Sequence, residues 1–368
     1  MSDIIYVDNK PVPKVDDSRK YFLNVLTILF GPSGSGKSSI IMHILNTIRD
    51  VVPMGIVCCP TNASNGDYDK IIPAECIYDD LTADLMKKVF IRQSNVLAMY
   101  NMVRSIDILR PLFDLVSDDA SSNKIGKLDK LIRDSIAKVR NVYEPDEIDS
   151  VIEDLQSRYQ KKVVKIMRAC IKDNRQTLSG MALTEMQKSI LNNLEINPNL
   201  LLIIDDCAAS IKEWRDLEET KQLFFQGRHF KVTTILTMQN ESIIPVPLRS
   251  NAHISIFTTK KIATTYFLKA SSGASPEERK WIERIAAIIF APSDDNNRPN
   301  YKKLVMFGNI IATEDKLQYM IATPRRKRFG SSATWEMCNR VRREMPNAIT
   351  KNSFTKMFNL KPTPQLSE

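Results

Sequence analysis

One stretch of the chain, residues 23–48, limits the possible folds more than any other. An apolar, partly β-branched run at residues 23–30 ends abruptly in glycines and serines, and isoleucine and leucine then recur at helical spacing from residue 40 to residue 48. A short uncharged run of this kind is typical of a strand buried in a parallel sheet. The stretch therefore predicts a strand, a loop and a helix in that order, which is the start of an α/β fold.

The loop between the strand and the helix matches the pattern G-x-x-x-x-G-K-[ST]. In this pattern the glycines let successive backbone N–H groups turn inward around the α- and β-phosphates of a nucleotide. We expect Lys37 to reach the β- and γ-phosphates and Ser38 to place its hydroxyl on Mg²⁺, at the positive end of the helix dipole. The alternative is a glycine-rich turn that matches by chance, and the flanking strand and helix argue against it. The expected nucleotide-binding residues are Gly31, Pro32, Ser33, Gly34, Ser35, Gly36, Lys37, Ser38 and Ser39.

Two further predicted strands end in polar side chains. The run at residues 199–204 ends in Asp205 and Asp206, and the run at residues 232–238 ends in Gln239. Ligands of parallel sheets bind at the carboxyl edge, so we expect Asp205 to hold the Mg²⁺ shell and Asp206 to polarise the attacking water. Gln239 can hydrogen-bond the γ-phosphate or that water, which requires its strand to lie between the other two. A solvated Asp-Asp turn and an ordinary polar strand end are the alternatives.

The 368 residues suffice for one large α/β domain with insertions or for two domains. No apolar stretch approaches the roughly 18 residues of a membrane helix, and the first 20 residues are too polar for a signal peptide, so we expect a cytosolic protein. The six cysteines show no zinc-binding spacing, which favours reduced, buried thiols and no metal cluster.

The pattern along the chain predicts four parts. Residues 1–20 read as an irregular N-terminal arm, residues 21–80 and 196–322 as the α/β core, residues 81–195 as a helical insertion, and residues 323–368 as a basic, partly disordered tail. Apolar stripes at 128–139 and 148–170 predict a helical hairpin inside the insertion, with residues 117–126 as its mobile connector. Further expected strands are at 55–60, 76–78 and 253–257, with a hairpin formed by 304–307 and 318–321.

The net charge of +9 is unevenly distributed. Residues 1–249 carry 32 lysines and arginines against 33 acidic residues, whereas residues 250–368 carry 20 against 10. This excess suggests a polyanion partner, although a solvated surface is the simpler reading. The candidate contacts to DNA phosphates are Arg325, Arg326, Lys327 and Arg328, and a nuclear-targeting or capsid-docking patch is the alternative role for the same run.

Taken together, the motifs resemble those of the FtsK/HerA-like genome-packaging ATPases of large nucleocytoplasmic DNA viruses and relatives such as those of virophages. The resemblance covers about residues 20–260 and rests on four segments, at 31–38, 201–206, 226–239 and 247–251. It implies a P-loop NTPase of the RecA-like, additional-strand type that hydrolyses ATP with Mg²⁺. It also implies a homo-oligomeric ring, a pentamer or hexamer, that translocates double-stranded DNA into a capsid in the viral factories of the host cytoplasm. Capsid or inner-membrane virion proteins are further candidate partners.

Such a ring needs an arginine that reaches the ATP of a neighbouring subunit. Arg249, on a loop before a predicted strand, is the first candidate, and Arg228 is the second.

Three other P-loop classes stay open at this point. An ABC-type ATPase is suggested by Leu178-Ser179-Gly180, although Met181 and Ala182 replace the following glycine and glutamine of that signature. A small-molecule kinase shares the loop pattern but needs no pair of acids so late in the chain. A GTP-binding protein is disfavoured because no N-K-x-D motif occurs.

Overall fold

The computed structural model describes residues 4–16, 18–142, 145–207, 211–239, 244–269, 272, 274–292, 301–308 and 316–344. The chain divides into two compact units. Residues 1–93 and 199–368 form the first, which we call the core unit, and residues 94–198 form the second, which we call the helical unit.

The core unit is built on an eight-stranded sheet with the order β10-β9-β8-β3-β7-β6-β4-β5. Pairing is parallel from β8 to β5, and antiparallel between β8 and β9 and between β9 and β10. The α/β class and the mostly parallel sheet are thus confirmed, as is the predicted hairpin at its edge. The strands are β3 (Leu26–Phe30), β4 (Met54–Cys58), β5 (Ile77–Tyr78), β6 (Leu200–Ile204), β7 (Val232–Met238), β8 (Ile254–Phe257), β9 (Lys302–Phe307) and β10 (Leu317–Ile321).

Every residue of β3, β4, β6, β7 and β8 is buried. Uncharged strands of this kind gain stability only when both faces of the sheet are covered. The strand order also confirms that β7 lies between β3 and β6. The carboxyl ends of these three parallel strands therefore lie next to one another.

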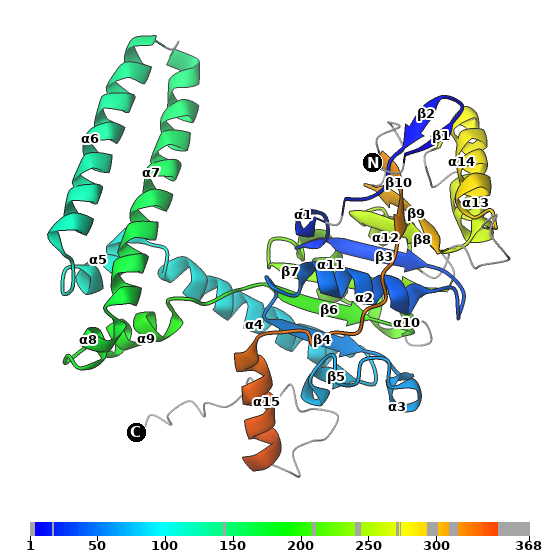
Figure 1. Ribbon diagram of the computed structural model, residues 1–368, viewed down its shortest axis with the longest axis horizontal. Coiled ribbons are helices and arrows are strands. Elements are labelled where there is room, and N and C mark those ends of the chain that lie inside the picture. The colour runs from blue at the N-terminus through cyan, green and yellow to red at the C-terminus, as the bar shows by residue number, and fades with distance from the viewer. Residues whose placement is uncertain are drawn as a thin grey trace. The chain divides into compact units, whose positions relative to one another are not determined.

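The helices of the core unit cover the sheet (Figure 1). The helix that follows β3, α2, buries a continuous apolar stripe that includes Ile40, Ile41, Ile44, Leu45 and Ile48. The other helices that lie entirely in this unit are α1 (Arg19–Phe22), α3 (Asn62–Asn65), α10 (Ile211–Trp214), α11 (Glu218–Gln226), α12 (Val246–Arg249), α13 (Lys260–Leu268), α14 (Pro276–Ile289) and α15 (Ser332–Glu344), beside α2 (Lys37–Ile48) and the 3-10 turn η1 (Ala74–Cys76).

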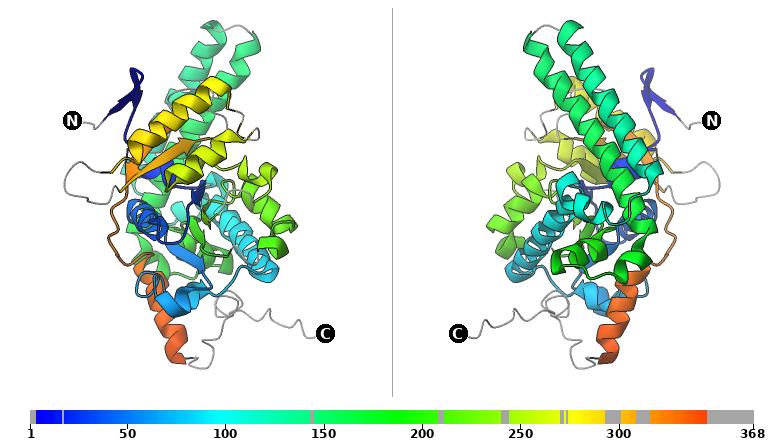
Figure 2. Two further views of the ribbon diagram at one scale, coloured as in Figure 1. Left: turned by 90° about the vertical axis from the view of Figure 1, so that its right-hand side faces the viewer. Right: turned by 90° about the vertical axis from the view of Figure 1, so that its left-hand side faces the viewer.

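The helical unit contains a long antiparallel pair, α6 and α7, which run side by side in both views of Figure 2. The predicted hairpin is thereby confirmed, and the Tyr159 hydroxyl donates a hydrogen bond to Asp129 at 2.5 Å within it. The mobile connector expected at residues 117–126 is wrong, because α6 already begins at Asp119. Asp118, just before this helix, accepts a hydrogen bond from the Ser121 backbone N–H. The helices are α5 (Ile106–Phe113), α6 (Asp119–Val142), α7 (Pro145–Asp173), α8 (Arg175–Ser179) and α9 (Glu185–Asn193), and α4 (Ala83–Met102) begins in the core unit.

The N-terminal residues differ from the expected irregular arm. They form a two-stranded hairpin of β1 (Ile5–Val7) and β2 (Lys10–Val12), joined by Asp8 and Asn9 at φ of 52° and 62°. Aspartate and asparagine tolerate this left-handed conformation, which a tight two-residue hairpin turn requires.

Beyond β10 the chain packs against the core unit as far as its described residues reach. Phe329 is fully buried and its backbone N–H donates to Ile71 O at 2.9 Å. On α15, Arg342 makes two hydrogen bonds, of 2.8 and 3.1 Å, to the buried Glu75 carboxylate. The part of the predicted tail beyond residue 344, including its expected disorder, lies outside the described residues.

All six cysteines are buried and free, as predicted. Within the described residues no helix combines the length and apolar character needed to cross a membrane.

Candidate functional site

The loop of residues 31–36, which we call the phosphate loop, joins β3 to α2. Gly34 and Gly36 have φ of 73° and 93°, where any other side chain would be strained. Gly31 leaves no room for a side chain, because a Cβ there would lie 1.8 Å from Thr258 Oγ1. Its N–H donates to Met238 O on the neighbouring β7 at 2.9 Å. These contacts hold the loop in a tight turn at the end of β3.

The Lys37 ammonium lies over this loop. It donates to Gly31 O at 2.8 Å and to Pro32 O at 2.9 Å. Burial lowers the pKa of Lys37, and the nearby Asp205 and Asp206 carboxylates partly offset that effect. The cation therefore lies at the phosphate loop, near enough to both acids at the end of β6 to be affected by their charges.

The first acid, Asp205, is held on both carboxylate oxygens. Tyr68 Oη donates to Oδ2 and Thr237 Oγ1 donates to Oδ1, each at 2.7 Å. Asp205 is 8% exposed and Tyr68 is fully buried. Burial, followed by the Asp205 charge, raises the pKa of Tyr68 well above its ordinary value, so this hydroxyl remains a donor. The carboxylate is thus fixed in one orientation.

The second acid, Asp206, points elsewhere because its backbone is left-handed, with φ of 57°. Its N–H donates to Thr237 Oγ1 at 3.0 Å, and its Oδ1 accepts a hydrogen bond from Gln239 Nε2 at 3.1 Å. A non-glycine residue in this region is uncommon and is stabilised here by these two contacts. The end of β7 therefore touches both acids, through Thr237 and Gln239.

The residues at this edge suit Mg²⁺ by their chemistry. Magnesium takes oxygen ligands and keeps several waters while it binds one or two carboxylates and a substrate phosphate. The Ser38 hydroxyl, at the start of α2, and the fixed Asp205 carboxylate are oxygen donors of this kind.

Four supporting residues were not predicted from the sequence: Tyr68, Thr237, Thr258 and Lys303. Lys303 on β9 is 8% exposed, and its ammonium donates to Ser35 O at 3.1 Å and lies 3.5 Å from Thr258 O. Burial lowers its pKa. Thr258 Oγ1 lies 2.7 Å from Ser35 Oγ. Lys303 follows Lys302 at the start of β9, and nothing in this local sequence distinguishes it from an ordinary charged strand end.

The two candidate arginines lie in different environments. Arg249 is 6% exposed, with its guanidinium 5.4 Å from the centre of the Tyr266 ring. Arg228 is exposed and contacts His229. Their roles toward a neighbouring subunit stay predictions.

Two members of the basic run at residues 325–328 already have protein partners. Arg326 pairs with Asp67 at 2.8 Å, and the Arg328 guanidinium lies 4.1 Å from the centre of the Trp335 ring. Arg325 and Lys327 are exposed. The role of the run in DNA binding stays a prediction.

The segment that suggested an ABC signature lies in the helical unit. Leu178 of α8 is fully buried there, in the apolar cluster of that unit. Packing thus accounts for the leucine of this segment.

No family model matches the chain. It is 28% identical over 345 residues to protein B354L of African swine fever virus, which is described as uncharacterised, and the match covers 90% of this chain and 92% of that protein. Protein L437 of Acanthamoeba polyphaga mimivirus, also uncharacterised, is 20% identical over 235 residues, covering 64% of this chain and 52% of that protein.

Among solved structures, the genome-packaging NTPase B204 of Sulfolobus turreted icosahedral virus 2 in complex with ATPγS matches with a TM-score of 0.32 and 13% identity, over 84% of this chain and 99% of that chain. The conjugation coupling protein TcpA of pCW3 matches with a TM-score of 0.35 and 11% identity, over 94% of this chain and 71% of that chain. The chain is thus similar in sequence to uncharacterised proteins of large DNA viruses.

Proposed function

We propose that the protein is an ATPase that translocates double-stranded viral DNA into a capsid. The observation that carries the proposal is the carboxyl edge of β3, β7 and β6, where a phosphate loop, a lysine, two acids and a glutamine meet. The origin of the relatives, in large DNA viruses, supports the DNA-packaging part.

The residues at this edge divide the work of hydrolysis. Lys37 neutralises charge on the β- and γ-phosphates. Ser38 and Asp205 would hold Mg²⁺, which supplies further charge neutralisation at the phosphates. Asp206 accepts a proton from the attacking water or orients that water. The Gln239 amide is hydrogen-bonded to the Asp206 carboxylate at 3.1 Å and also contacts the γ-phosphate. The position of this carboxylate therefore depends on the contact between the amide and the γ-phosphate.

The active species is a homo-oligomeric ring in which an arginine completes the site of the neighbouring subunit. Arg228 is exposed, whereas Arg249 is buried against Tyr266 and would have to be released from that contact. DNA is held by contacts to its phosphates, since a motor that moves along any sequence cannot depend on reading bases. The site of action is the host cytoplasm.

Two variants test the hydrolytic assignment. Lys37→Ala should abolish ATP binding or turnover, because the phosphates lose their counter-ion. Asp206→Asn should keep ATP bound and lose turnover, because only the activation of water is affected. Equal loss of ATP binding in both variants would contradict this division, and ATPase activity that duplex DNA does not stimulate would contradict translocation.

The arginine assignment needs mixed rings. Subunits with Arg228→Ala or Arg249→Ala are combined with Lys37→Ala subunits, and recovered activity identifies the arginine that acts across the interface. A monomer that is fully active in the same assay would rule out this role for both.

A further inference from the structure

The helical unit contains a hollow of about 300 Å³, within the size range of small-ligand sites. It lies far along the chain from the phosphate loop, and its polar lining consists of Arg104, just after α4, and of Ser157, Gln160, Lys161, Lys165 and Arg168 on α7. All the residues that line it are described, and none of them is acidic.

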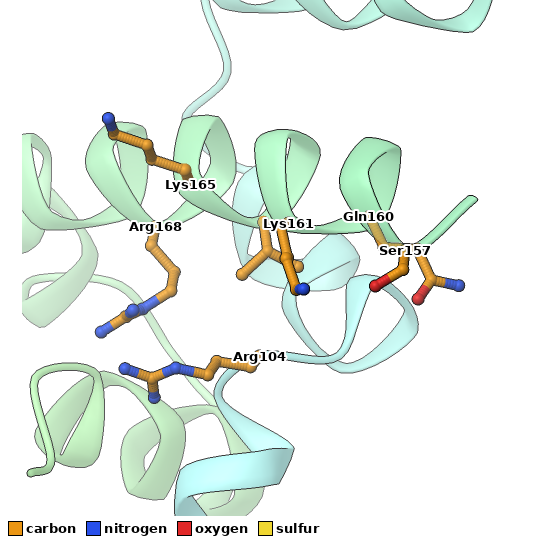
Figure 3. A pocket seen from close by; sticks show the side chains of 7 residues that line it. Arg104, Ser157, Gln160, Lys161, Lys165 and Arg168 are labelled. Atoms are coloured by element: carbon orange, nitrogen blue, oxygen red, sulfur yellow. The ribbon is translucent and has the colours of Figure 1, made fainter. Parts of the chain in front are cut away.

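The centre of the hollow is formed by two arginines. Figure 3 shows the guanidinium groups of Arg104 and Arg168 pointing toward each other from opposite walls, with Lys161 pointing to the same side, while Lys165 points away. The Arg104 guanidinium lies 3.4 Å from the centre of the Tyr100 ring, and its Nη1 donates to Tyr100 O at 3.2 Å.

Arg168 is also held in place. Its Nη2 donates to Leu194 O, at the end of α9, whereas its Nε is buried and has no hydrogen-bond partner. An Arg side chain presents five donors in a planar fork that matches the oxygens of a carboxylate or phosphate. Arg168 thus keeps donor capacity at a fixed position.

Two guanidinium groups that face each other repel. Burial, and then the Arg168 charge, lower the pKa of Arg104. The Glu195 carboxylate, which interacts with Arg168, is also hydrogen-bonded to Lys172 at 2.6 Å. An anion between the two arginines removes the repulsion and satisfies their remaining donors.

The charge along α7 strengthens the field in the hollow. Its first part, residues 146–154, contains five acids and no base, whereas its second part, residues 158–173, contains six bases and one acid. The hollow is lined by residues of the second part. Like charges gathered along one part of a helix attract anions to that part.

We propose that this hollow binds a phosphate group, with Arg104 and Arg168 as its donors and Lys161 at its rim. The phosphate belongs either to the backbone of duplex DNA or to a small free anion such as inorganic phosphate. The first source rests on the proposed DNA-translocating function, whereas the site itself does not.

The test uses the full chain and the variant R104Q/R168Q. The matched control, R133Q/R140Q, removes two exposed arginines from α6 and changes the net charge equally. Duplex DNA affinity is measured across a salt series for all three proteins. In a plot of log affinity against log salt concentration, loss of one phosphate contact should lower the magnitude of the slope by about 0.9 in the hollow variant. The slope of the control variant should equal that of the wild type.

The second arm uses inorganic phosphate, with the phosphate loop saturated by ATPγS and Mg²⁺. Phosphate should raise the melting temperature of the wild type and of the control, and this rise should be lost in the hollow variant. A lost rise with an unchanged DNA slope assigns the hollow to a free anion, and a lowered slope assigns it to DNA. Unchanged behaviour of the hollow variant in both arms overturns the proposal.

Arg168 also supports the end of α9, so the double variant could fold poorly. In that case K161Q serves as the hollow variant and K138Q as its matched control, since both lysines are exposed and only Lys161 lines the hollow. The same two measurements decide, with K138Q as the control. If the wild type binds no duplex DNA at all, the proposed function fails while the phosphate arm still decides the site.

Discussion

Removal of one hydroxyl, in Tyr68→Phe, tests how the site is built. The ring is fully buried and stays in place, so the change takes away only the 2.7 Å hydrogen bond to Asp205 Oδ2. Thr237 still donates to Oδ1. The carboxylate then keeps one of its two fixed donors and can rotate about the remaining one.

The magnitude follows from the charge of the acceptor. A hydrogen bond to a charged group contributes about 1.5–3 kcal/mol, so the free energy of unfolding should fall by this amount. Loss of a hydrogen bond that orients a metal ligand typically costs about 10–100-fold in metal affinity. We therefore expect the free Mg²⁺ concentration that gives half-maximal ATP turnover to rise about 10–100-fold, with a smaller change in turnover at saturating Mg²⁺.

ATP turnover is measured at saturating ATP across a Mg²⁺ titration, and stability is measured by urea unfolding. The control is Tyr21→Phe, in a tyrosine of the same unit whose ring packs 5.4 Å from that of Phe307. It should change neither quantity by more than a fraction of the Tyr68→Phe effect. If Tyr68→Phe lowers stability but leaves the Mg²⁺ dependence as in the wild type, Tyr68 supports packing only, and the assignment of Asp205 to the metal loses its main support.

Three further predictions concern other parts of the core unit. Lys303→Met should weaken binding of a fluorescent ATP analogue by about tenfold without loss of stability, because a buried cation beside the phosphate loop is replaced by an apolar chain of similar length. Lys302→Met is the control, and equal affinities of the two variants for the analogue would contradict a role of Lys303 in nucleotide binding. Arg342→Ala should lower the free energy of unfolding by about 2 kcal/mol, since it leaves the buried Glu75 carboxylate without its arginine while the arginine itself is 45% exposed; an unchanged urea midpoint would refute this. Burial lowers the pKa of His253, so its imidazole stays neutral in the folded state at pH values where the unfolded chain takes up a proton. The free energy of unfolding should therefore fall as the pH drops below about 6.5, by at most about 1.4 kcal/mol per pH unit. His253→Asn should remove this part of the dependence of stability on pH.

Much of the fold follows from local pattern. The runs that became β3, β6 and β7 are short and uncharged and are followed by a glycine, an acid and a glutamine respectively, and a buried parallel strand needs little more than that. Their order was predictable as well, because a glutamine that senses phosphate must lie beside both the loop and the acids. The N-terminal hairpin was missed because its strands have three residues each and the second contains lysine and proline, which weaken the strand pattern.

The supporting residues of the site could not be predicted, for a different reason. Tyr68 and Asp205 are 137 residues apart in the chain, and Lys303 and Ser35 are 268 apart. Nothing in the sequence around Tyr68 or Lys303 indicates such a partner, since each contact depends on how distant elements pack. Local sequence patterns indicate which strand ends carry the reactive side chains. Tertiary packing decides which distant residues hold those side chains in place.

The pair Asp205 and Asp206 shows how tertiary contacts distinguish two neighbouring residues of the same type. Two adjacent carboxylates at a strand end are chemically equal in the sequence, and their assignment to metal and to water rested on order alone. In the structure the first is buried and accepts hydrogen bonds from two hydroxyls, whereas the second has a left-handed backbone and accepts a hydrogen bond from Gln239. Thr237 links the two, since its hydroxyl donates to the Asp205 carboxylate and accepts from the Asp206 N–H. Because this one side chain contacts both acids, we expect substitutions at Thr237 to disturb Mg²⁺ dependence and water activation together.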